Sequence, residues 1–113
     1  MSVLQFAYQL VQGLVQSKNP ANKILKYSQN IELYLLQNFS AKGRGITEML
    51  NSVGNYFQPQ DDALIRRLAA QRNRAVHLGI DRIDIDQFER DYRLLIQRIR
   101  SHYPKTVWDY SDH

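Results

Sequence analysis

The chain has 113 residues, a length typical of one domain that buries a hydrophobic core without needing disulfides or metal ions. It contains no cysteine, which excludes disulfides, thiolate metal sites and cysteine nucleophiles, and favours a cytoplasmic location. Fifteen basic residues against eleven acidic ones give a net charge of +4, an excess that permits an anionic partner such as nucleic acid without requiring one.

The first predicted helix covers residues 3–17. Gln5, Gln9 and Gln12 interrupt its apolar residues, and no lysine or arginine precedes it. A signal peptide has a cationic start, and a membrane span needs about 20 consecutive apolar residues. We therefore expect a core helix here, with no secretion signal and no membrane contact.

The second predicted helix covers residues 20–38, after Asn19 as its cap and with Pro20 at its first position. Its wide apolar face predicts contact with several other helices. A glycine-rich loop follows, and Lys42 and Arg44 in this loop are candidates for binding RNA or a small nucleotide. The alternative is a connection whose charges are simply solvated.

Three more helices are expected in the rest of the chain, at residues 46–56, at residues 61–77 and from the cap at Asp84 to residue 102. Asp61 and Asp62 suit the positive end of a helix dipole, and adjacent helical residues point about 100° apart, which favours a cap over a metal or acid–base site. The sequence pattern thus predicts an all-α chain with five helices.

The expected domain covers residues 1–103, and residues 104–113 form a short aromatic tail. Trp108 and Tyr110 of this tail could stack on nucleic-acid bases, or they could pack on their own bundle or on a partner subunit.

Nine of the ten arginines lie between residues 66 and 100, mixed with acidic residues. Such a mixture usually indicates a solvated helix surface with intrahelical ion pairs. Asp86 with Arg90, and Glu89 with Arg93, have the favourable spacing and order for such pairs.

Arg72 is the unusual member of this set. On a helical wheel the apolar residues of the helix span an arc from about 0° to about 140°, with Arg72 at about 80°; they are Leu64, Ile65, Leu68, Ala69, Ala75 and Val76. A buried guanidinium needs a partner. Either Glu32 or Glu48 pairs with it inside the monomer, or the stripe is a subunit interface where Arg72 lines a cleft open to phosphate.

His77 follows five positions after Arg72, which separates the two side chains by about 140° around the helix and about 7.5 Å along it. They share a site only if the helix distorts near Gly79 or if two subunits combine. Otherwise His77 is a cation that suits the C-terminal end of the helix dipole.

The segment Arg72-Asn73-Arg74-Ala75-Val76-His77 resembles the signature of the HEPN superfamily, an arginine followed after four to six residues by a histidine, with a polar residue after the arginine. The helical layout of about two-thirds of the chain is also similar to small single-domain members. The resemblance implies an all-α, HEPN-like bundle of four or five helices that forms a two-fold homodimer, with both motifs at a cleft in the interface.

The resemblance further implies a metal-independent endoribonuclease of the toxin or defence type, with no cofactor. The ribose 2′-hydroxyl would attack the phosphorus, with His77 as general base or acid, Arg72 neutralising the phosphoryl oxygens and Asn73 orienting the phosphate or the histidine. Lys42, Arg44 and Arg74 would bind RNA.

The partners implied are RNA, a second copy of the chain and an antitoxin or regulatory protein. Toxin members paired with nucleotidyltransferase antitoxins often carry a tyrosine where this chain has Gly79, which argues against that antitoxin mechanism here. The alternative function is a non-catalytic HEPN-like module that binds RNA or a protein.

Overall fold

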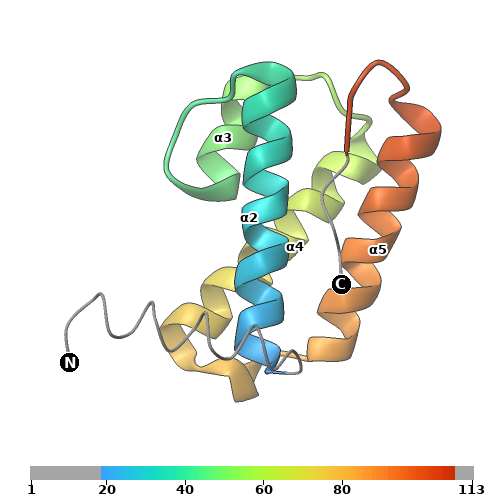
Figure 1. The fold of residues 1–113 in the computed structure, drawn as a ribbon. Helices are drawn as coiled ribbons and strands as arrows, with labels where there is room; N and C mark the ends of the chain where they lie inside the picture. The colour runs from blue at the N-terminus through green and yellow to red at the C-terminus, as the bar shows by residue number, and fades with distance from the viewer. Residues whose placement is uncertain (1–18, 109–113) are drawn as a thin grey trace.

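The helices of the protein begin and end close to where the sequence places them. The computed structural model describes residues 19–108, and this part of the chain is all-α, with no strand. The predicted helix at residues 3–17 lies outside the described residues. The elements, shown in Figure 1, are α2 (Pro20–Phe39), α3 (Gly45–Val53), α4 (Pro59–Leu78), the short 3-10 helix η1 (Ile80–Arg82) and α5 (Ile85–His102).

Local capping explains both ends of α2. The Asn19 side chain accepts a hydrogen bond of 2.9 Å from the backbone N–H of Ala21, and Pro20 occupies the first turn, where its missing N–H costs nothing. At the other end Ser40 takes a left-handed conformation with φ 53°, and its N–H donates to the carbonyl of Leu36. The predicted start of α2 is confirmed, and its end lies one residue beyond the prediction.

Two boundaries differ from the prediction by more than one residue. Helix α3 ends at Val53 instead of residue 56, because Gly54 adopts φ 81° and closes the helix. Helix α4 begins at Pro59 instead of Asp61, because proline suits the first helical turn. Asp61 and Asp62 lie in the first turn of this helix, as predicted. The cap itself is Gln58, and the Asp61 carboxylate accepts hydrogen bonds from Arg98 of α5, so the prediction that Asp61 acts as a cap is wrong.

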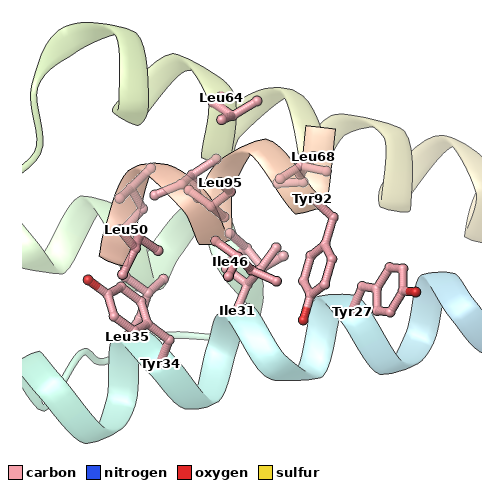
Figure 2. Packing of buried hydrophobic residues seen from close by; sticks show 14 of the residues in the cluster. Tyr27, Ile31, Tyr34, Leu35, Ile46, Leu50, Leu64, Leu68, Tyr92 and Leu95 are labelled. Atoms are coloured by element: carbon pink, nitrogen blue, oxygen red, sulfur yellow. The ribbon is translucent and has the colours of Figure 1, made fainter. Parts of the chain in front are cut away.

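The core lies where α2, α4 and α5 face one another, with α3 covering one end. Figure 2 shows Tyr27 and Ile31 of α2 beside Tyr92 of α5, and Leu68 of α4 above them. The rings of Tyr27 and Tyr92 stack with centroids 4.0 Å apart. Asn30 donates a buried hydrogen bond of 2.8 Å to the Tyr92 hydroxyl. Among the described helices, none combines the length and hydrophobicity needed to span a lipid bilayer.

The start of the C-terminal tail packs on the bundle. Trp108 is 5% exposed, and its ring lies against Tyr34, with centroids 5.2 Å apart, and against Tyr92. The Asn38 side chain holds the tail by accepting from the N–H of Val107 and donating to its carbonyl. Burial raises the pKa of Tyr34 to about 12. Of the alternatives open at Trp108, packing on its own bundle is the one observed, and Tyr110 lies outside the described residues.

Candidate functional site

Arg72 lies on α4 with its side chain half-buried and without a carboxylate partner. Its Nη1 donates to the Oδ1 of its neighbour Asn73 over 3.2 Å. Within residues 19–108 no carboxylate oxygen approaches the guanidinium nitrogens to 4.0 Å, so neither Glu32 nor Glu48 forms the internal ion pair. The alternative in which a carboxylate of the monomer neutralises Arg72 is therefore not observed in the part of the chain that the structure describes.

The apolar stripe around Arg72 is buried along only part of its length. Leu68 and Ala69 are buried in the core, as the wheel predicts. Val76 lies on the same predicted face but is 54% exposed, and Leu78 beyond it is 63% exposed. The stripe is therefore covered around Leu68 and Ala69 and open at Val76.

A pocket of about 350 Å³ opens beside Arg72, between α4 and the start of α3. Helix α4 contributes Ala69, Arg72 and Asn73, and the chain from Arg44 to Glu48 forms the other wall. The two walls meet because α3 packs against α4. Three of the six predicted site residues therefore line one pocket: Arg44, Arg72 and Asn73.

The loop before α3 is held firmly against that helix. Gly43 has φ 134° and approaches so closely that a Cβ atom added there would lie 2.5 Å from the Cβ of Glu48. The N–H of Lys42 donates to the Ser52 hydroxyl over 2.9 Å, and this hydroxyl donates to the carbonyl of Met49. These contacts hold the chain beside Arg44, which lines the pocket and lies directly before the first turn of α3.

The other predicted site residues lie outside the pocket. His77, Arg74 and Lys42 are exposed, and none of them lines it. Helix α4 stays regular through His77, since Gly79 still donates its N–H to the carbonyl of Ala75. The distortion that would bring Arg72 and His77 of one chain together is therefore not observed.

The buried acids of the bundle are fully engaged elsewhere. Asp91 is 3% exposed and accepts hydrogen bonds from Arg67, Gln71 and Gln87. Burial raises the pKa of Asp91, but these hydrogen bonds lower it by more, so the net pKa lies below its usual value. Because the donors satisfy the carboxylate, Asp91 joins α4 to α5 and has little capacity left for a ligand. Residues 19–108 contain no group of three or more His, Asp or Glu side chains arranged to hold a metal ion.

One of the two predicted surface ion pairs forms. Arg93 donates to Glu89 over 3.0 Å, as predicted, and the pKa of Glu89 is lowered chiefly by this hydrogen bond. Arg90 instead donates to the side chain of Gln87, so its predicted pair with Asp86 is wrong. The side chain of Asp84 caps α5 by accepting from the Gln87 N–H, as predicted.

Comparison of the chain with protein-family models, curated proteins and solved structures finds no match in any of the three. The resemblance to the HEPN superfamily thus rests on the motif and the helical layout. Sequence reasoning missed Glu48 as a wall of the pocket, because it considered this residue only as an ion-pair partner. Its place in the first turn after the glycine-rich loop was the available signal.

Proposed function

We propose that the protein is a metal-independent endoribonuclease of the HEPN type, in the toxin or defence class. The observation that carries the proposal is the half-buried Arg72, which has no carboxylate partner in the described residues and faces a pocket shared with Arg44 and Asn73. Partial burial of an unpaired guanidinium is costly. A phosphate group of RNA in the pocket would offset this cost.

The reaction needs a base, an acid and stabilisation of charge. The 2′-hydroxyl loses its proton and forms a bond to phosphorus, while the bond from phosphorus to the 5′-oxygen breaks and that oxygen gains a proton. The products are a 2′,3′-cyclic phosphate and a free 5′-hydroxyl. His77 serves as general base or acid, Arg72 neutralises the phosphoryl oxygens, and Asn73 orients the phosphate.

The site is completed by a second copy of the chain. Five residues of regular helix separate Arg72 from His77, so their side chains diverge by about 140°. In a two-fold dimer the His77 of one chain can approach the Arg72 of the other. Val76 and Leu78, which are exposed beside His77, supply apolar surface for such a contact. Lys42, Arg44 and Arg74 bind the RNA around the site.

The test compares wild type, His77→Ala and His102→Ala on structured and unstructured RNA in EDTA. His102 is the matched control because it is also an exposed histidine in the last turn of a helix. We expect His77→Ala to slow cleavage about 100-fold or more and His102→Ala to leave it unchanged. Cleavage by His77→Ala at the wild-type rate would overturn the catalytic assignment. DNA lacks the attacking 2′-hydroxyl, so the wild type should not cleave it.

The second candidate is a non-catalytic HEPN-like module that binds RNA or a protein. The position of His77 outside the pocket favours it. Absence of cleavage by the wild type, together with retained RNA binding, would support this alternative. Sedimentation at high micromolar concentration separates the two further, because a strictly monomeric chain cannot form the two-chain site.

A further inference from the structure

The pocket between α3 and α4 is lined by charged side chains of both signs that do not pair with one another. Arg44 and Glu48 come from the α3 side, and Arg72 comes from α4. Among residues 19–108, neither the Glu48 carboxylate nor the Arg44 guanidinium has a hydrogen-bond or ion-pair partner. Opposite charges that share a pocket without meeting leave room for a ligand that offers both donors and acceptors.

A phosphate group alone uses only part of this pocket. Phosphate oxygens are acceptors and suit Arg44 and Arg72, but the Glu48 carboxylate would repel them. Glu48, whose side chain is exposed, instead suits a ligand with hydrogen-bond donors. Ile46 and Ala69 line the pocket from the core side and are 4% and 3% exposed, so they give it an apolar floor.

Guanine has the matching set of groups. Its N1–H and exocyclic N2–H₂ are adjacent donors and can bind both oxygens of one carboxylate. Its O6 and N7 atoms are acceptors that arginine binds with two hydrogen bonds. Adenine, cytosine and uracil have no pair of adjacent donors on one edge. Single-stranded RNA presents these edges freely because its bases can be splayed out.

We propose that the pocket binds one guanine base of single-stranded RNA, and that Glu48 is the residue that determines this specificity. Glu48 accepts from N1–H and N2–H₂, Arg44 donates to O6 and N7, and Arg72 holds the adjoining phosphate. The volume of about 350 Å³ lies at the lower end of the range for ligand pockets and suits a single base. The inference rests on the proposed function in taking RNA as the substrate.

The test measures the affinity of the full chain for short 2′-O-methyl oligoadenylates, which lack the attacking hydroxyl. The central base is guanine, hypoxanthine, which lacks the N2 amino group, or adenine. We expect guanine to bind roughly tenfold more tightly than either of the others, by fluorescence anisotropy. The variant Glu48→Gln should lose this preference, while Glu32→Gln, which changes a carboxylate on another helix outside the pocket, should retain it.

Equal affinity of the wild type for guanine and hypoxanthine would overturn the assignment, as would a guanine preference that survives in Glu48→Gln. Circular dichroism of each variant confirms that it is folded. Cleavage of ordinary RNA separates the two proposals. Cleavage without preference for sites beside guanine would leave the nuclease proposal intact and overturn the guanine pocket. Guanine-selective binding without any cleavage would leave the guanine pocket intact and overturn the nuclease proposal.

Discussion

Replacing Asp61 with asparagine should reveal how much one buried carboxylate contributes to joining α4 and α5. Asp61 is 1% exposed and accepts hydrogen bonds of 2.8 Å and 3.1 Å from Arg98, and another from the Tyr103 hydroxyl. The variant Asp61→Asn keeps the volume of the side chain but removes its charge and replaces one acceptor oxygen with a donor. The Arg98 guanidinium would then face an amide nitrogen that cannot accept its hydrogen bond.

The expected loss in the free energy of unfolding is about 2–3 kcal/mol. Breaking a fully buried ion pair costs more, but the Arg98 side chain is 21% exposed and can recover some hydration. For a chain of this length the loss corresponds to a fall in Tm of roughly 8–12 °C. The neighbouring variant Asp62→Asn is the control. Asp62 forms a surface pair with Arg66 one helical turn away, worth about 0.5 kcal/mol.

The contribution of Asp61 should also depend on pH. Burial raises the pKa of its carboxyl, but the hydrogen bonds from Arg98 and Tyr103 lower it by more, so the folded pKa lies below the ordinary value of 3.8. The folded state therefore favours the ionised form. Its stabilising effect is fully present well above 3.8 and is lost as the pH falls through the depressed folded value.

Urea denaturation followed by far-ultraviolet circular dichroism measures these free energies. We expect wild type and Asp61→Asn to differ most near neutral pH and to converge in acid, below the depressed folded pKa of Asp61. A loss for Asp61→Asn no larger than that for Asp62→Asn would refute the reasoning. So would a difference from wild type that persists undiminished in acid.

Two further predictions concern the loop and the tail. Gly43→Ala should lower the free energy of unfolding by about 2 kcal/mol or more, because the new Cβ would clash with the Cβ of Glu48 and because φ at this position is unfavourable for alanine. Gly54→Ala is the control: it has φ 81° but no atom near the new Cβ, so it should cost only about 1 kcal/mol in the same denaturation assay. Asn38→Ala should shift the fluorescence emission of Trp108, the only tryptophan, to longer wavelength because the tail loses two hydrogen bonds. An unchanged spectrum would mean that the aromatic contacts of Trp108 and the remaining hydrogen bonds of the tail are enough to hold it.

The boundaries of the helices could be predicted because the signals are local. Asn19, Pro20 and Asp84 act on backbone groups within three residues of themselves, so the printed sequence already contains both partners of each contact. The largest boundary error is at the end of α3, where the predicted helix runs past Gly54, although this glycine takes a positive φ and ends the helix. The apolar periodicity likewise identified an all-α bundle.

The charged residues show where such reasoning ends. Nothing in the sequence around Asp61 and Asp91 distinguishes them from exposed acids, yet both are buried. Their arginine partners lie 37 and 24 residues away in the chain. The same-helix pair of Glu89 and Arg93 was predictable, because a single helix brings them together. Pairs between helices depend on which helix packs against which, and no spacing rule contains that information.

The candidate site divides in the same way. The sequence by itself determined that α4 carries an arginine on its apolar face and a histidine five residues later, because a helical wheel can be drawn from the residues of one helix alone. Only the tertiary structure decided that Arg72 shares a pocket with Arg44 and Glu48 while His77 lies outside it. The physical reason is that a pocket is the space left between two packed helices, and its shape and charge depend on both of its walls at once.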